Sequence, residues 1–197
     1  MIERFGRRFY SVLPNLLGTK LTVTDRHGAE ILFVPIKNLG HSSEINVFPD
    51  KNSKDSLLIV RPVYPQRGKG WLAKVKHFIS GPTHHDVIDL RTGSKIGALR
   101  LEIDTRNPKD QKWVFMDVHD GDFGHLEPMS RTTWGAKFEH SGFIGDRPVC
   151  HFKSRNIITG RSINVDLALD ANRELDARLA VAAAVKMAVD MVNLASD

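Results

Sequence analysis

The stretch INVDLALDANRELDARLAVAAAVKMAVDMVNL, residues 163–194, decides the fold, because its patterning changes from that of a strand to that of a helix. In the first part apolar and polar residues alternate, which puts every second side chain on one face of a strand. The apolar face holds Ile163, Val165, Leu167 and Leu169. From about residue 172 the chain is rich in the helix formers Ala, Leu and Met. We therefore predict a half-buried strand and then a long C-terminal helix capped by Asp170 or Asn172.

The predicted helix carries few polar residues. At about 100° per residue they gather on one side, and the remaining surface is apolar apart from Asp176. The polar set is Glu174, Arg178, Lys186, Asp190 and Asn193. An apolar face of this width allows two arrangements: a terminal helix lying on a sheet, or a helix enclosed by the sheet with its polar strip at one mouth. Lys186 and Asp190, four residues apart, are expected to form an ion pair.

The chain before this stretch has the pattern of successive β-hairpins. Apolar runs are separated by turns rich in Asp and Gly, which suit the backbone geometry of tight turns. These turns lie at 25–28, 89–93, 120–121 and 145–146. The basic N-terminus is expected to open a first strand, and further strands are predicted at 44–48 and 57–61. One-sided alternation indicates an antiparallel sheet with one wet face.

Length and composition indicate one domain that covers residues 1–197. The chain has 197 residues, of which 41% are hydrophobic and 26% charged, which is typical of a globular protein. The fold class predicted is mainly β with one long C-terminal helix. A closed antiparallel barrel removes exposed sheet edges. A barrel of many strands leaves a lumen that a helix can fill.

Targeting signals are weak in this sequence. Ser11, Pro14 and Asn15 interrupt the apolar run near the N-terminus, so we do not expect a signal peptide. No apolar run reaches the length of a membrane-spanning helix. The single cysteine, Cys150, allows no internal disulfide and lies in an apolar strand, which predicts a packed core residue. A reducing, cytoplasmic location is expected.

Two basic segments are the candidate binding sites. The net charge is +5, and residues 56–85 contain no acidic side chain. Cations beside a tryptophan suit an anionic phospholipid surface, whereas the plainer interpretation is a solvated loop. The candidate ligand-binding residues are Arg61, Arg67, Lys69, Trp71, Lys74 and Lys76, and a secondary basic patch holds Lys153, Arg155 and Arg161. Nucleic acid is not expected as a partner, because no recognised motif supports it.

Motifs for catalysis, metals and cofactors are missing or incomplete. The segment GKGWLA at 68–73 lacks the alternating strand and helix units of a dinucleotide site. The acidic residues near 117–122 are those of a hairpin turn and do not match a calcium loop. His84 and His85 are adjacent on a strand and therefore point to opposite faces. We predict no catalytic residue, no metal site, no cofactor and no enzymatic activity.

Four segments resemble the bacterial LURP-one-related family. LGTKLTVTDRHGAEILFVPIKN at 17–38 resembles the opening repeat of that family. EINVFPDKNSKDSLLIVRP at 44–62 resembles its next strands. HDVIDLRTGSKIGALR at 85–100 resembles the repeat of the family, in which a turn with Asp and Gly precedes an Ile-Gly strand start. Residues 163–192 resemble its final strand and central helix, and also the C-terminal segment of phospholipid scramblases.

The resemblance implies a tubby-like closed barrel of about twelve antiparallel strands enclosing a central hydrophobic α-helix. Tubby proteins bind phosphoinositides, and scramblases are linked to membranes and bind calcium. The expected function is thus a non-enzymatic module that binds anionic phospholipid through the basic segment, located peripherally at the membrane. The alternative is a structural or protein–protein interaction module with no lipid ligand.

Overall fold

The computed structural model describes residues 2–15, 19–36, 43–64, 83–103, 111–131, 138–156, 163–171 and 174–194. A short helix, α1 (Ile2–Phe5), precedes the strands, and a long helix, α3 (Ala177–Leu194), follows them. The strands are β1 (Phe9–Pro14), β2 (Lys20–Thr24), β3 (Glu30–Pro35), β4 (Ile45–Val47), β5 (Leu58–Val63), β6 (His84–Asp89), β7 (Ser94–Ile103), β8 (Gln111–Met116), β9 (Asp122–Arg131), β10 (Phe138–Ile144), β11 (Arg147–Asn156) and β12 (Ile163–Leu169). The predicted mainly β fold with one long C-terminal helix is confirmed.

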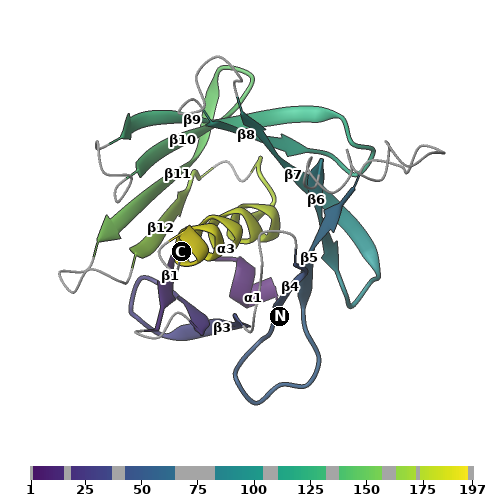
Figure 1. Cartoon of the computed structure of the whole chain (residues 1–197), viewed down its shortest axis with the longest axis vertical. Helices are drawn as coiled ribbons and strands as arrows, with labels where there is room; N and C mark the ends of the chain where they lie inside the picture. Colours follow the sequence, from purple (N-terminus) through teal and green to yellow (C-terminus); the bar gives the residue numbers. More distant parts are fainter. Residues whose placement is uncertain are drawn as a thin grey trace.

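All strands belong to one 12-stranded sheet in the order β3-β2-β1-β12-β11-β10-β9-β8-β7-β6-β5-β4. Each neighbouring pair is antiparallel, and β1 lies between β2 and β12. The sheet curves round until its two edge strands meet (Figure 1). There Phe33 and Phe48 exchange two backbone hydrogen bonds of 2.9 and 2.8 Å. The result is a nearly closed antiparallel barrel whose seam lies between β3 and β4.

The N-terminal segment takes part in this seam. The Arg4 Nη1 donates to the backbone carbonyl of Ile31 in β3 at 2.6 Å, and also to the carbonyl of Pro49 just after β4. One guanidinium therefore joins the two edge strands. A first strand with a basic start was expected here, but residues Ile2–Phe5 are helical and β1 begins only at Phe9. Arg4, a cation of this basic N-terminal stretch, therefore contacts the seam from helix α1 and does not belong to a strand.

Helix α3 contributes a continuous buried stretch to the hydrophobic core. Every residue from Leu179 to Val189 is at most 4% exposed. The helix packs against β12 and β1 and also against β5 and β7, which lie on opposite sides of it in Figure 1. Most of the buried positions are Ala or Val, whose small side chains allow the strands to approach closely. Among the described residues, neither helix combines the length and hydropathy needed to cross a membrane.

The helix starts later in the chain than predicted. Asp176 is its cap, because the Asp176 Oδ1 accepts a hydrogen bond of 2.8 Å from the backbone N–H of Arg178. The predicted cap at Asp170 is wrong, because α3 begins only at Ala177, and Asn172 lies outside the described residues. Asp170 still belongs to the sheet, since its N–H donates to the carbonyl of Val149 at 2.9 Å. Sheet pairing therefore continues past β12 and delays the helix.

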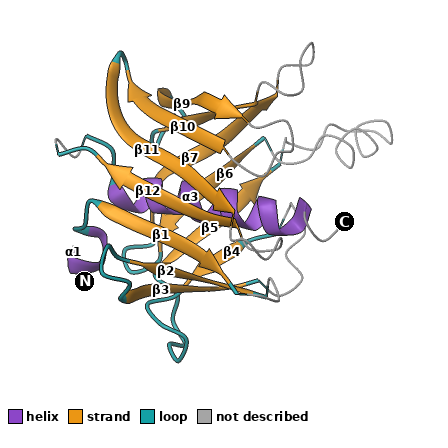
Figure 2. Cartoon of the chain, turned by 90° about the vertical axis from the view of Figure 1, so that its left-hand side faces the viewer, coloured by secondary structure: helices purple, strands orange, loops and turns teal. Residues whose placement is uncertain are grey.

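The predicted Asp and Gly turns are confirmed. The Asp25 Oδ1 accepts from the N–H groups of His27 and Ala29 at 2.9 and 3.0 Å. Gly28, Gly93 and Gly145 have positive φ angles, which glycine adopts without strain. These turns join β2 to β3, β6 to β7 and β10 to β11. They share one end of the barrel with the start of α3, at the left of Figure 2, and we call it the turn end.

One part of the outer face departs from the one-sided pattern. Ala98, Val114 and Met116 form a small buried cluster that is separate from the main core. They alternate with Leu99 and Phe115, which belong to the main core. The expectation that this whole face is wet is therefore wrong at β7 and β8. Alternation along a strand tells which residues share a face, but not whether that face is covered.

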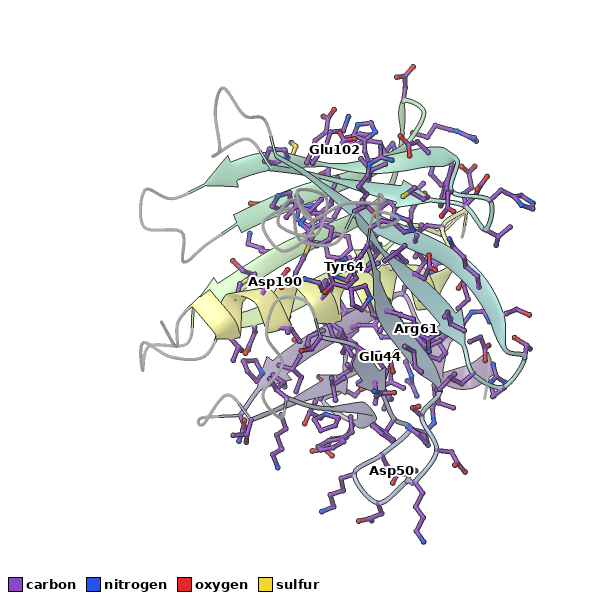
Figure 3. All side chains as sticks on the ribbon, turned by 45° about the vertical axis from the view of Figure 1, so that its right-hand side comes forward. Glu44, Asp50, Arg61, Tyr64, Glu102 and Asp190 are labelled. Atoms are coloured by element: carbon purple, nitrogen blue, oxygen red, sulfur yellow. The ribbon has the colours of Figure 1, made fainter. Side chains whose placement is uncertain are left out.

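The C-terminal half of α3 holds the predicted ion pair. The Lys186 Nζ lies 2.5 and 2.6 Å from the two carboxylate oxygens of Asp190 and 5.8 Å from the ring centroid of Trp113. Lys186 is only 4% exposed, and Asp190 is labelled in Figure 3. His85 of β6 is also buried, and burial together with the Lys186 charge lowers the pKa of His85 to about 3. His85 is thus neutral at pH 7, and Asp190 balances the lysine.

Asp190→Asn should destabilise the protein by about 3 kcal/mol, because it leaves the buried Lys186 ammonium without its counter-charge. The free energy of unfolding, measured by urea denaturation at pH 7, checks this expectation. The matched control is Lys186→Met combined with Asp190→Leu, which removes both charges and should be less destabilising than Asp190→Asn alone. Equal stability of Asp190→Asn and the wild type would contradict the expectation.

Candidate functional site: an arginine-lined pocket at the turn end

The described part of the chain includes only some of the residues predicted to bind lipid. Arg61 is exposed on β5, and its Nε lies 2.7 Å from the Glu44 Oε2. Figure 3 labels both residues. A carboxylate therefore already pairs with this guanidinium. The other predicted residues, Arg67, Lys69, Trp71, Lys74 and Lys76, lie outside the described residues.

The secondary basic patch is also described only in part. Lys153 on β11 is exposed, with its Nζ 3.7 Å from the Glu139 Oε1. Arg155 belongs to the same strand, but its side chain lies outside the description, as does the whole of Arg161. Binding of anionic lipid by either basic segment therefore stays a prediction.

A pocket of about 350 Å³ lies at the turn end of the barrel. Its walls come from the N-terminal segment, the β6–β7 turn, the end of β12 and the start of α3. The lining residues are Phe5, Gly6, Arg7, Arg8, Arg91, Leu169, Asp170, Leu175, Asp176, Ala177 and Arg178. Four arginines from three distant parts of the chain thus converge on one cavity.

Two buried carboxylates hold three of these arginines. The Asp89 side chain accepts hydrogen bonds from the backbone N–H of Arg91 at 3.0 Å, from the Arg91 Nη2 at 3.0 Å and from the Arg178 Nη1 at 2.8 Å. The Arg7 Nη1 lies 2.5 Å from the Asp25 Oδ2. Asp89 and Asp25 are only 1% and 5% exposed. The turn carboxylates therefore lie beneath the arginines and fix their positions.

Both carboxylates are ionised at neutral pH. Burial acts to raise the pKa of Asp89, but hydrogen bonds from Arg91 and Arg178 outweigh it and hold that pKa below its ordinary value. Burial likewise acts to raise the pKa of Asp25, but the N–H groups of Ala29 and His27 and the charge of Arg7 lower it overall. Each arginine that these aspartates hold therefore faces a full negative charge.

The charges are arranged in layers. The side chains of Arg7 and Arg91 are 43% and 41% exposed, whereas the carboxylates of Asp25 and Asp89 beneath them are 4% and 2% exposed. Arg8 is also exposed and forms no ion pair within the described part of the chain. Two further aspartates, Asp170 and Asp176, line the pocket itself. Asp170 is exposed and Asp176 pairs with Arg178, so of these aspartates only Asp25 and Asp89 lie beneath the arginines.

The free donors of the pocket come from Arg7, Arg8 and Arg91. Arg178 is occupied, because its Nε and Nη2 donate to Asp176 and its Nη1 donates to Asp89. Guanidinium groups bind carboxylate and phosphate oxygens through paired N–H donors. The start of α3 adds the partial positive charge of a helix N-terminus, which Asp176 offsets in part. The arrangement can therefore bind an anion, with Arg178 as part of the frame.

Another group contains residue types that bind metals. One ligand atom from each of His84, Asp86 and Asp120 lies within 4.8 Å of the others. The Lys95 Nζ, however, lies 2.6 Å from the Asp86 Oδ1 and 2.5 Å from the Asp120 Oδ1. Its ammonium group bridges both carboxylates and balances one of their two charges, so we interpret the group as a surface ion-pair network. The predicted opposite directions of His84 and His85 are confirmed, since His84 joins this network and His85 is buried.

Two further groups in the described part of the chain contain nucleophilic residue types. The Ser141 Oγ lies 3.4 Å from the His151 Nδ1, and the His151 Nε2 lies 3.0 Å from the Glu139 Oε1. The first distance is long for a hydrogen bond, and His151 is 40% exposed on the outer wall. Cys150 is a packed core residue, as predicted, because it is 6% exposed and burial raises the pKa of its thiol to about 12.

Comparisons with known proteins found no relative. No protein-family model, no curated protein and no solved structure matches this chain.

Sequence reasoning missed this pocket, because its arginines are far apart in the chain and each lies near acidic residues. A local signal exists in the repeated spacing Asp-x-Arg, at 89–91 and at 176–178. In both places the arginine donates to the aspartate two residues before it. The sequence does not show that the second arginine also reaches the first aspartate across 89 residues.

Asp89→Asn should lower the melting temperature at pH 7, because Arg91 and Arg178 lose their shared counter-charge. The pKa of Asp89 is depressed in the folded state, so its stabilising effect is full above the ordinary carboxyl pKa of about 3.9. That effect is lost as the pH falls through the lower folded-state pKa. The difference in melting temperature between Asp89→Asn and the wild type should therefore shrink below about pH 4. A difference that is constant between pH 7 and pH 3 would contradict this.

Proposed function

We propose that this chain is a non-enzymatic barrel domain that binds a phosphate-bearing ligand in the arginine-lined pocket. The observation that carries the proposal is the set of unused guanidinium donors of Arg7, Arg8 and Arg91 around one cavity. Guanidinium donors held by buried carboxylates lose little further freedom on binding, which favours affinity. A phosphate group offers enough oxygens to accept from several of them at once.

The apolar part of the lining indicates what is attached to the phosphate. Phe5, Leu169 and Leu175 line the pocket beside the arginines. A headgroup with an apolar continuation would place its oxygens on the guanidinium groups and its carbon atoms on these side chains. Both an anionic phospholipid and a free organic phosphate have this chemistry, so the experiment must separate the two sources.

The proposal includes a tubby-like arrangement in which the barrel encloses α3. The burial of every residue from Leu179 to Val189 supports it, as do the contacts of α3 with β1, β5, β7 and β12. The family resemblance of the hairpin order supports it as well. In this arrangement the pocket lies where the helix enters the barrel.

The basic segment from Arg61 to Lys76 is a second proposed contact with anionic lipid. Its flanking described residues, Val63 and Thr83, lie where β5 ends and β6 begins, opposite to the turn end. The pocket and these two described residues therefore lie at opposite ends of the barrel. Variants of one should leave the other intact, so binding experiments can tell them apart.

Arg8→Gln should weaken the binding of inorganic phosphate about tenfold, the loss expected for one charge-assisted hydrogen bond. Arg8 forms no ion pair with the described residues, so this change leaves the pairs of the pocket in place. Isothermal titration calorimetry measures the affinity. The matched control is Lys20→Gln, an exposed cation that begins β2 at the other end of the barrel. An Arg8→Gln variant with wild-type affinity would overturn the assignment of the pocket.

Vesicle sedimentation identifies the source of the phosphate. Vesicles of phosphatidylcholine, with and without phosphatidic acid, are compared at low and high salt, because screening weakens exposed charge contacts. Binding that Arg8→Gln weakens indicates a lipid headgroup in the pocket. Binding that is lost only when Arg67, Lys69, Lys74 and Lys76 are changed to Gln indicates the basic segment. Binding to phosphate without binding to vesicles indicates a free organic phosphate.

Failure to bind either phosphate or vesicles would overturn the proposal. The protein would then be considered a structural or protein–protein interaction module.

A further inference from the structure

The N-terminal segment belongs to two features at once, the seam of the barrel and the arginine-lined pocket. Arg4 bonds to both edge strands of the seam. The next four residues, Phe5 to Arg8, line the pocket. Only two residues separate Arg4 from Arg7, so the position of the first restricts the position of the second.

The segment is held at both of its ends. On the seam side, the Arg4 guanidinium donates to the carbonyl oxygens of Ile31 and Pro49. On the sheet side, the carbonyl of Arg8 accepts from the N–H of Leu169 at 2.7 Å. The backbone N–H of Arg7 also donates to the Tyr10 hydroxyl at 3.2 Å. Arg7 and Arg8 therefore face the pocket from a short segment with two anchors.

The seam itself has few backbone bonds. Apart from Arg4, the hydrogen bonds found between the described edge residues of β3 and the β4 side are the two that Phe33 and Phe48 exchange. By contrast, β11 and β12 pair over seven successive residues. Local opening of a sheet starts where the fewest bonds must break. The seam next to Arg4 is accordingly the weakest part of the described sheet.

We propose that Arg4 is a positioning residue for the pocket, and that an anion bound by Arg7 and Arg8 tightens the barrel seam. This inference rests on the proposed function, because it requires an anion in the pocket. With Arg4 in place, Arg7 and Arg8 are already ordered before the ligand arrives. Without Arg4, the ligand must order the segment itself, and its affinity falls.

Thermodynamic linkage makes the coupling between anion binding and docking of the N-terminal segment reciprocal. If the docked segment binds the anion better than the released segment, then the anion favours the docked segment by the same factor. Docking keeps the Arg4 guanidinium on the carbonyls of Ile31 and Pro49, which holds the edges of β3 and β4 together. Bound anion should therefore reduce opening at Phe33 and Phe48, although neither residue lines the pocket.

Local opening of the seam is measured by amide hydrogen exchange, followed by NMR on the full chain with and without inorganic phosphate. In the wild type, phosphate should slow exchange at the Phe33 and Phe48 amides several-fold. Amides within the β7–β8 pair, such as that of Phe115, should be unaffected. Arg4→Ala should speed exchange at the seam and remove the effect of phosphate on it.

Isothermal titration calorimetry on the same variants measures the affinity of the pocket for inorganic phosphate. Arg4→Ala should raise the dissociation constant for inorganic phosphate about tenfold, and Arg4→Lys, which keeps the charge and a donor, should recover part of the loss. The matched control is Lys51→Ala, an exposed cation in the turn after β4 that touches neither the seam bonds nor the pocket. It should behave as the wild type in both measurements.

The outcomes separate this inference from the proposed function. If the wild type binds phosphate but Arg4→Ala binds it equally well, the coupling is overturned and the pocket assignment stands. The same holds if phosphate leaves exchange at Phe33 and Phe48 unchanged. If the wild type does not bind phosphate, both are overturned. Tighter wild-type binding, together with slower seam exchange that Arg4→Ala abolishes, supports the coupling.

Discussion

The buried carboxylate of Asp89 is the interaction on which the arrangement of the turn end depends. It accepts from the turn that follows β6 and from Arg178 at the start of α3, so one side chain links the barrel wall to the C-terminal helix. A buried charge without partners is strongly unfavourable, and the helix can supply Arg178 only if it begins at this place. The start of α3 and the β6–β7 turn therefore restrict each other, and the pocket forms between them.

Ion pairs with a buried partner occur both at the start of α3 and in its C-terminal half, but different partners are buried in the two places. In the C-terminal half, Lys186 and Asp190 form an ion pair beside Trp113, and Lys186 is almost fully buried. At the turn end, in the Arg7–Asp25 and Arg91–Asp89 pairs, the carboxylates are the buried partners and the arginines are the exposed ones. Because the exposed partner determines what a ligand meets, the turn end presents guanidinium donors. This difference in layering is the reason that we assign anion binding to the turn end.

Much of the fold could be predicted from local patterns. The Asp and Gly turns, the alternation in β12, the core position of Cys150 and the Lys186–Asp190 pair depend on residues close together in sequence, and all are present. The start of α3 was predicted too early, because sheet pairing of Asp170 with Val149 competes with helix formation. The arginine-lined pocket was not predicted, because its residues come from the N-terminus, the middle and the end of the chain.

The sequence by itself determined the class of the elements: a series of antiparallel hairpins and one long apolar helix with an internal ion pair. Periodicity and turn chemistry are local properties, so they can be read without the fold. Only the tertiary structure decided that Arg4 joins β3 to the β4 side, that Arg178 reaches Asp89, and that Arg7, Arg8 and Arg91 face one cavity. These contacts depend on how the sheet curves and where its edges meet, which no single segment encodes.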